Sequence, residues 1–449
     1  MSLPIVPILN YAAQQCAAGA PVWAWFAQRI RSSREAHASL PILPFSPLET
    51  RQVFEGVMAS SAAPSARVVY VHIPFCRQSC RFCGYSRELV GDEQQVTAYL
   101  LALQRQLEYL ARQSWTQTHP FSALYFGGGT PTVVPAAALT ALIKRFRQAL
   151  PFTDDVEITV ESSITDISAE GLACLYAAGV NRMSFGIQTF DGDLRHHLGR
   201  KADTPLILER LNQAKTAGFS QIAADFIYGL PTQRPEQWQQ DMDRIRETPL
   251  TGCSIYPLIL FPKSPLVRQG YQYADTQIQD EYAAFCVADI TLADGGWQCL
   301  TPVQYARPQL DHAVYVTAYG HAADVLALGA GAAGQCGPLM YLNTPDVAAY
   351  IAGWNSDTGI FPQVITRLAP YAELYHWYRL SEGLTLNLRE FPDAPPPLIQ
   401  LLTALVELEL VQEDGQTAAL TQSGRFWAGN IAALISGIIR DLAQQKKSQ

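Results

Sequence analysis

Short apolar runs alternate with amphipathic stretches in the middle of the chain, from residue 66 to about residue 260. The apolar runs have the length of strands, and the stretches between them repeat apolar positions at helical spacing. This alternation predicts an α/β fold of parallel strands joined by crossover helices. Six such units predict a partial (β/α)6 barrel rather than a complete eightfold one. The predicted strands are Val68–Ile73, Ala123–Phe126, Val156–Val160, Arg182–Gly186, Ile222–Ile227 and Gly252–Leu258.

The two ends of the chain follow other patterns. Before residue 66 we expect one helix, Ala12–Ser32, and then a Pro-rich extended arm. Near the C-terminus, Pro396–Leu408 has helical periodicity, and the pair Asp414-Gly415 predicts a hairpin turn, an order typical of a winged-helix-like α+β region. We therefore expect an N-terminal helix and arm (1–65), a barrel (66–265), an extension (266–360) and a winged-helix-like region (361–449).

Composition and charge narrow the possible functions. The chain has 449 residues, of which 48% are hydrophobic and 16% charged, and its net charge is −8. An acidic chain disfavours nucleic acid as a partner, and Glu413 and Asp414 in the wing favour a packing role for the winged-helix-like region. Neither a membrane-spanning run nor a secretion signal is evident, so we expect a cytoplasmic protein. The oligomeric state is not indicated.

Three of the nine cysteines form a cluster. Cys76, Cys80 and Cys83 follow the first predicted strand in a polar loop, with the spacing Cys-x3-Cys-x2-Cys. An even number of cysteines in dispersed pairs would indicate a secreted disulfide framework, whereas one cluster among nine cysteines indicates a reducing compartment and a metal site. A closed zinc site needs four ligands. Three thiolates would instead hold three irons of a [4Fe–4S] cluster and leave the fourth iron open to a substrate or cofactor.

The cysteine loop and the preceding His72-Ile73-Pro74-Phe75 resemble the radical S-adenosylmethionine (SAM) superfamily, specifically its HemN-like branch. The resemblance extends over residues 67–260, and a weaker one over residues 329–343. It implies a [4Fe–4S] cluster that binds SAM, a flavodoxin- or ferredoxin-type electron donor, and cleavage of SAM to a 5′-deoxyadenosyl radical. The branch includes coproporphyrinogen III oxidases, haem chaperones and anaerobic haem-degrading methyltransferases.

The same resemblance implies which residues hold SAM. The turn Gly127–Thr130 would hold its methionine part, while Glu161, Gln188 and Asp225 stand at or after predicted strands, on the catalytic face of a barrel. For any one of these alone, a structural ion pair or a helix cap is an equal alternative. The expected cluster ligands are Cys76, Cys80 and Cys83, and the expected cofactor contacts are Tyr70, Phe82, Gly128, Gly129, Thr130, Glu161, Gln188, Arg200 and Asp225.

One position distinguishes the members of this branch. Coproporphyrinogen oxidases carry a fourth cysteine where this chain has Tyr85, which disfavours that activity. Gly84 before an aromatic residue, and the small-residue run Gly329–Gly334, resemble the haem-degrading group, which uses two SAM molecules. We therefore expect methylation and opening of haem or a related tetrapyrrole; the alternatives are a haem chaperone or a class C methyltransferase for another aromatic substrate. The candidate haem contacts are His312, His321 and His376.

Overall fold

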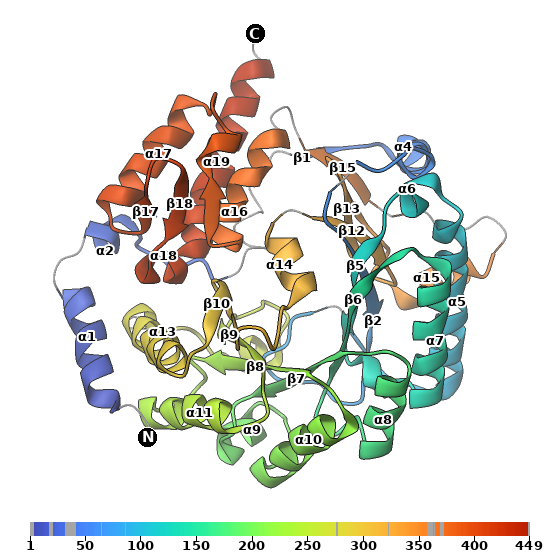
Figure 1. Ribbon diagram of the computed structural model, residues 1–449, viewed down its shortest axis with the longest axis horizontal. Coiled ribbons are helices and arrows are strands. Elements are labelled where there is room, and N and C mark those ends of the chain that lie inside the picture. Colours follow the sequence, from blue (N-terminus) through green and yellow to red (C-terminus); the bar gives the residue numbers. More distant parts are fainter. Residues whose placement is uncertain are drawn as a thin grey trace.

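Parallel strands form the centre of a long, curved sheet (Figure 1). The structure is a computed structural model, and it describes residues 4–17, 21–31, 42–63, 65–85, 87–274, 277–321, 323–356, 362, 364–368 and 372–447. Within these residues the sheet has 13 strands, and a consecutive set is parallel in the order β12-β2-β5-β6-β7-β8-β9. These are β2 (Arg67–Ile73), β5 (Phe121–Gly128), β6 (Phe152–Ser162), β7 (Arg182–Gln188), β8 (Gln221–Tyr228), β9 (Gly252–Pro257) and β12 (Asp324–Leu328).

Burial on both faces explains why these strands are apolar throughout. In β2, successive side chains point to opposite faces, yet Val68, Val69 and Val71 are all fully buried. The predicted α/β fold is confirmed, and each of the six predicted strands is present. β12 adds a further parallel strand from the predicted extension, because it lies beside β2 with Val325 opposite Val68.

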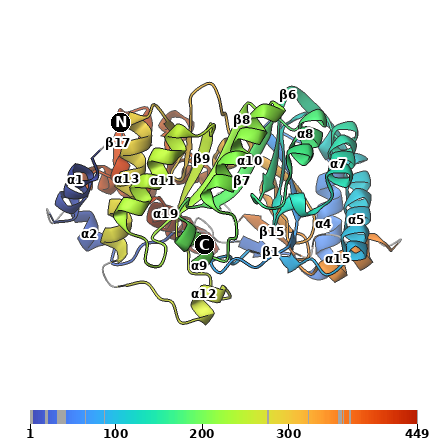
Figure 2. The same ribbon diagram turned by 90° about the horizontal axis from the view of Figure 1, so that it is seen from below.

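Helices surround the barrel (Figures 1 and 2), and one helix lies inside the ring in the view of Figure 1. The first two backbone N–H groups of this inner helix, α14 (Val314–Gly320), donate to the carboxylate of Glu157 at 2.7 and 3.1 Å. Just before it, Asp311 forms a buried ion pair of 3.0 Å with Arg182, the first residue of β7. The inner segment thus contacts the amino end of the barrel. The outer helices are α5 (Glu93–Ala111), α7 (Ala136–Ala149), α8 (Ala169–Ala177), α10 (Thr204–Ala217), α11 (Pro235–Glu247) and α13 (Gln277–Asp294).

Antiparallel strands extend the sheet at both edges. Part of the predicted Pro-rich arm, Ile42–Pro44, is β1, which pairs with β15 (Val364–Leu368) at one edge. Residues 32–41, which include the end of the predicted helix and the start of the predicted arm, lie outside the described residues. Among the described residues, no helix combines the length and apolar character that a bilayer crossing requires. The other added strands are β13 (Ala333–Cys336), β14 (Leu339–Leu342), β11 (Gln304–Ala306) and β10 (Gln298–Thr301), and α4 (Pro47–Ala59), α6 (Ser114–Gln117) and α15 (Val347–Trp354) pack nearby.

The predicted N-terminal helix Ala12–Ser32 is wrong. The structure has two helices instead, α1 (Ile5–Ala17) and α2 (Pro21–Trp25), and an irregular segment after Trp25. Pro21 is the physical reason, because proline has no N–H group for a continuing helix but is favoured at the start of a new one.

The C-terminal region is a small α+β unit. The predicted helix is confirmed as α17 (Pro396–Glu407), and the predicted hairpin turn joins β17 (Val411–Glu413) to β18 (Thr417–Leu420). Gly415 in that turn has a φ of +81°, a conformation that glycine adopts without strain. The unit is completed by α16 (Tyr378–Glu382), β16 (Thr385–Asn387), α18 (Gln422–Phe426) and α19 (Ala428–Lys447).

A buried arginine joins the N-terminal segment to the barrel and to the C-terminal region. The guanidinium of Arg29 donates to Glu281 at 2.8 Å, to the Tyr228 hydroxyl at 2.9 Å and to the Phe426 carbonyl at 3.2 Å. It also lies 3.7 Å from the centre of the Phe426 ring. Arg31 donates to the same Glu281 carboxylate, which is itself buried. Residues nearly 400 positions apart are therefore held at one point.

We expect Arg29→Ala to lower the free energy of unfolding by about 3 kcal/mol, because it leaves the buried Glu281 with one cation fewer and opens a gap beside the Phe426 ring. Urea unfolding measures this loss. The matched control is Arg51→Ala, which breaks an exposed pair with Glu55 and should cost about 0.5 kcal/mol or less. Equal losses in the two variants would contradict the central role of Arg29.

Candidate functional site

The cysteine loop begins at the carboxyl end of β2 and closes on itself. Its first residues, β3 (Phe75–Cys76), pair in parallel with its last, β4 (Glu88–Leu89). Arg87 links two points within the loop, because its guanidinium donates to the Cys83 carbonyl at 3.0 Å and to the Ser79 hydroxyl at 2.7 Å. All three cysteines are therefore carried by one short segment at the catalytic end of the barrel.

The three thiols lie close enough to affect one another electrostatically. Cys76 is buried, and Cys80 and Cys83 are half-buried. Burial raises the pKa of Cys76 and Cys83, the neighbouring thiols raise it further, and the Arg87 guanidinium opposes the rise. Among the described residues, no three His, Cys, Asp or Glu side chains approach closely enough for a single metal ion. A [4Fe–4S] cluster has a different requirement, because each thiolate binds its own iron.

The glycine turn after β5 packs directly against the start of the cysteine loop. The backbone N–H of Gly129 donates to the Ile73 carbonyl, and that of Thr130 donates to the Phe75 carbonyl, both at 2.8 Å. A Cβ atom on Gly129 would stand only 2.5 Å from the Phe75 oxygen, so only glycine fits here. The Thr130 hydroxyl lies 3.7 Å from the Cys76 sulfur. The predicted turn and the predicted cysteines are thus brought together.

Glu161 lies beside this turn at the end of β6. Its carboxylate accepts hydrogen bonds from the Tyr125 hydroxyl at 2.6 Å and from the Gly128 backbone N–H at 3.2 Å. Burial raises the pKa of Glu161 to about 7, and the nearby Asp225 carboxylate adds to the rise, whereas both hydrogen bonds lower it. The side chain can therefore change its charge near neutral pH.

Tyrosine rings line the interior next to Glu161. Tyr125 stacks on Tyr315 of α14, with 4.4 Å between ring centroids, and Tyr70 lies 6.0–6.1 Å from both. The Tyr70 hydroxyl is 2.9 Å from Nδ1 of His72. Sequence reasoning named Tyr70 but missed Tyr125 and Tyr315. The sequence did contain a signal for Tyr125: it is the third residue of its predicted strand, as Tyr70 is of the neighbouring one, and the structure places the two opposite each other. No comparable signal in the sequence indicated Tyr315.

The remaining predicted contacts meet at the ends of β7 and β8. Gln188 ends β7 at a break in the strand register with a φ of +72°, a rare conformation for a residue with a side chain. The Arg200 guanidinium lies 5.8 Å from the centroid of the Phe82 ring. Burial raises the pKa of the Asp225 carboxyl, and the positive charge of Arg200 opposes this rise. Nε of Arg200 is buried without a hydrogen-bond partner in the described structure, so the group suits an added anionic ligand.

Two further polar residues hold the loop after β7, and sequence reasoning missed both. Arg195 is fully buried and donates to the carbonyls of Ala202 at 2.6 Å and Thr189 at 3.1 Å. Asp241 accepts from the Thr189 hydroxyl at 2.6 Å. In the sequence Arg195 stands beside His196 and His197 and resembles a solvent-exposed charge, so no local pattern revealed its burial.

The candidate haem-contacting histidines are not gathered together with the cysteines. The backbone N–H of His312 donates to the side chain of Gln221, the first residue of β8, which places it at the amino end of the barrel. His321 is exposed after α14, and its Nδ1 lies 2.7 Å from the Thr317 carbonyl. His376 belongs to the C-terminal part, in a 3-10 helix over Ala372–Trp377.

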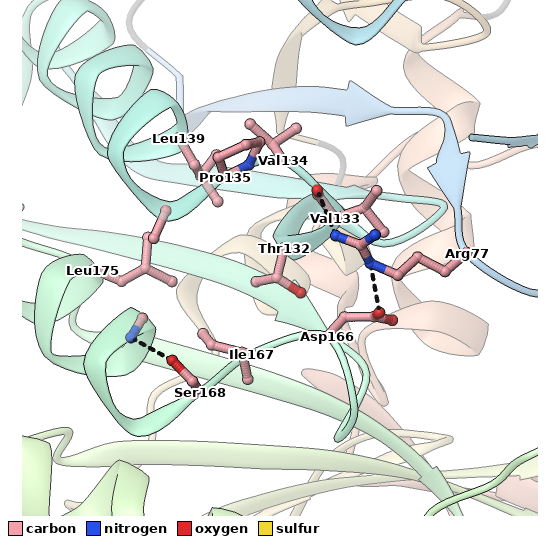
Figure 3. A pocket seen from close by; sticks show the side chains of 12 residues that line it. Arg77, Thr132, Val133, Val134, Pro135, Leu139, Asp166, Ile167, Ser168 and Leu175 are labelled. Carbon is pink, nitrogen blue, oxygen red and sulfur yellow. Dashed lines mark hydrogen bonds and ion pairs between the residues drawn. The ribbon is translucent and has the colours of Figure 1, made fainter. Parts of the chain in front are cut away.

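An apolar cleft of about 220 Å³ lies beside Arg77 of the cysteine loop, between α7 and α8 (Figure 3). Arg77 borders it, forming an ion pair with Asp166 at 3.2 Å and donating to the Val133 carbonyl at 3.4 Å. The predicted SAM contacts do not line this cleft, so it is separate from the predicted cofactor site. Its apolar lining includes Val133, Val134, Pro135, Leu139, Ile167 and Leu175.

Comparisons with known proteins agree with this geometry. Residues 70–245 match the family model of the radical SAM superfamily. The chain is 28% identical over 422 residues to anaerobilin synthase of Escherichia coli O157:H7, which covers 91% of this chain and 93% of that protein. It is 30% identical over 286 residues to the heme chaperone HemW of Bacillus subtilis (strain 168), covering 63% and 74%. Coproporphyrinogen III oxidase (HemN) from Escherichia coli, a radical SAM enzyme, has a similar structure, with a TM-score of 0.75 and 26% identity over 86% of this chain and 93% of that one.

The cofactors predicted from the sequence are those of this superfamily, a [4Fe–4S] cluster and SAM. The chemistry of the residues fits them. The loop offers three thiols, the turn offers backbone groups beside them, and the interior offers a buried carboxylate, Glu161, and the guanidinium of Arg200, whose Nε has no hydrogen-bond partner within the described residues. SAM carries an ammonium and a carboxylate, which such groups can bind by charge-assisted hydrogen bonds.

The pH dependence of SAM binding tests the place of Glu161. A cationic group of the ligand favours the ionised carboxylate, which is present above the pKa of about 7. We therefore expect the SAM affinity of the cluster-loaded protein to rise about tenfold from about pH 6 to about pH 8. Isothermal titration calorimetry with SAM measures this rise. Glu161→Gln should weaken binding and abolish the pH dependence; the same slope in both proteins would contradict the assignment.

Proposed function

We propose that this chain, which belongs to the HemN-like family of radical SAM proteins, methylates and opens haem or a related tetrapyrrole without oxygen. The observation that carries this proposal is the similarity to anaerobilin synthase, which extends over 91% of the chain and so includes the region after the barrel. The exposed Tyr85 supports it, since it occupies the position of the fourth cysteine expected in a coproporphyrinogen oxidase.

Each predicted site residue has a place in this proposal. Cys76, Cys80 and Cys83 would each bind one iron of the cluster and leave the fourth iron for SAM. When bound, the cluster and SAM supply a 5′-deoxyadenosyl radical. Around them, the unsatisfied Nε of Arg200 would donate to a carboxylate. The contacts proposed for the amino group, the ribose hydroxyls and the ring faces of SAM are Glu161, Asp225, Gln188, Gly128, Gly129, Thr130, Tyr70 and Phe82.

The protein also has to keep water away from a reactive intermediate. The stacked rings of Tyr70, Tyr125 and Tyr315 fill the interior beside Glu161, and the segment containing α14 contacts the amino end of the barrel. Tightly packed aromatic rings leave little room for water, and a dry site prevents side reactions of the radical. A second SAM molecule would then supply the methyl group that is transferred.

A haem chaperone is the second candidate, and the similarity to HemW supports it. Such a protein would keep the cluster and bind haem for delivery without consuming SAM. A class C methyltransferase for another aromatic substrate would instead turn over SAM without affinity for haem. The three activities therefore differ in products and in ligand affinity.

We also propose that the electron donor is an acidic carrier of the flavodoxin or ferredoxin class, in the cytoplasm. Although the whole chain has a net charge of −8, four exposed cations lie near the cysteine loop. The backbone of Arg81 bonds to Leu198 on one side and to Leu266 of α12 (Pro265–Arg268) on the other, and α12 projects beyond the barrel (Figure 2). An acidic partner would be steered toward such a surface. The four cations are Arg81, Lys201, Lys263 and Arg268.

Product analysis tests the proposed reaction. The reconstituted protein with reductant, SAM and haem should yield 5′-deoxyadenosine, S-adenosylhomocysteine and a haem-derived product of new mass, measured by liquid chromatography and mass spectrometry. Replacing Cys76, Cys80 or Cys83 by Ala should abolish all three, because each replacement removes one iron ligand. Cys174→Ala, at an exposed cysteine on α8, is the matched control and should have no effect. Tight haem binding without S-adenosylhomocysteine would favour the chaperone instead.

The cationic surface predicts a salt dependence. Binding of reduced flavodoxin should weaken about tenfold in Lys201→Glu/Lys263→Glu at low ionic strength, and the difference should vanish at about 1 M salt, where charges are screened. Isothermal titration calorimetry under anaerobic conditions measures the affinity. Lys144→Glu/Lys215→Glu, two exposed lysines on α7 and α10, changes the net charge equally and should have no effect. Equal affinity of all three proteins at low salt would refute this docking surface.

A further inference from the structure

Tyr85 and Phe261 form an aromatic pair beside the cysteine loop. The centroids of their rings are 5.5 Å apart, and the ring planes are inclined by 53°. Tyr85 remains 59% exposed, and Phe261 is only half-buried, so this pair is not part of the hydrophobic core. A large aromatic side chain that stays exposed beside a catalytic site has surface available to a ligand.

Gly84 determines where this pair lies. A Cβ atom at Gly84 would overlap the Cβ and Cγ atoms of Phe261, so Phe261 rests directly on the backbone of the cysteine loop. Any side chain at position 84 would push Phe261 away, because a contact that close cannot be relieved by a small shift. The order Gly84-Tyr85 thus supplies both the space for one ring and the second ring itself.

The pair stands at the carboxyl end of the barrel, near the proposed SAM contacts. Tyr85 follows Cys83 by two residues, and Phe261 follows the end of β9 by four. Because the two rings are in contact, the pair joins the segments that follow β2 and β9, two well-separated strands of the parallel set.

We propose that Tyr85 and Phe261 form a stacking platform for one face of the tetrapyrrole. This inference rests on the proposed function and names the surface that its substrate occupies. A tetrapyrrole is a wide, flat, conjugated ring, and such a ring gains most by covering exposed aromatic surface in offset or inclined contact. Bound there, its edge would lie toward the carboxyl ends of β2 and β9, where a radical formed from SAM could reach it.

Haem titration of the cluster-loaded protein tests the platform, with the haem absorbance band as the readout. We expect Tyr85→Ala and Phe261→Ala each to raise the dissociation constant for haem about tenfold, because each removes one aromatic contact. Tyr85→Phe keeps the ring and should bind as the wild type does. The double variant should bind only slightly more weakly than either single one, since two halves of one platform are not independent.

Tyr176→Ala is a closely matched control. Tyr176 is 46% exposed, its ring centroid is 5.4 Å from that of Phe219, and it lies against Gly218, where a Cβ would stand 2.6 Å from its ring. It belongs to α8 on the outside of the barrel, so its loss should leave haem binding unchanged. A similar fall in haem affinity in this control would show that the platform variants act through general destabilisation and would overturn the proposal.

The remaining outcomes separate the platform from the proposed function. If the wild type binds haem and all variants bind it equally well, the platform is refuted while the tetrapyrrole function stands. If haem binding is unchanged but reduction by flavodoxin is slowed in Tyr85→Ala, the pair serves the electron carrier and the platform is again refuted. If the wild type cleaves SAM but binds no haem, both the tetrapyrrole function and the platform fail together.

Discussion

The close approach of the glycine turn to the chain leaving β2 is the constraint on which the site depends. Two backbone hydrogen bonds of 2.8 Å hold the turn against Ile73 and Phe75, and the missing side chain of Gly129 allows the contact. The same turn offers the Gly128 N–H to Glu161 and the Thr130 hydroxyl to Cys76. One backbone arrangement therefore sets the distance between the thiols and the buried carboxylate.

Local patterns were sufficient to predict the elements that this constraint joins. The apolar strands, the cysteine spacing and the glycine turn are all short-range features, and each was found from the sequence. Two features could not be predicted: the long-range stacking of Tyr315 of α14 on Tyr125, and the burial of Arg195, which donates to carbonyls of its own loop after β7. No local periodicity records that a tyrosine will be covered by a segment more than 100 residues away, or that an arginine beside two histidines will turn inward to its own loop.

The N-terminal helices illustrate a different difficulty. A single helix was expected over Ala12–Ser32, whereas the structure ends α1 at Ala17 and leaves Arg29 and Arg31 in an irregular segment. Those arginines reach Glu281 and Phe426 from this irregular backbone, and a continuous helix would set their direction by its own geometry. Tertiary contacts thus determine the local structure here, and they join the first and last parts of the chain.

The position of β12 has a consequence for how the protein is made. Its two neighbours in the sheet are β2 and β13, and β2 precedes it by about 250 residues, so β2 has one unpaired edge until residue 328 has left the ribosome. The strand that leads into the cysteine loop is among the last to be completed on both sides. Late closure of a long-range pairing slows folding. It also leaves the thiols at the end of that strand a long interval during synthesis in which the barrel around them is still incomplete.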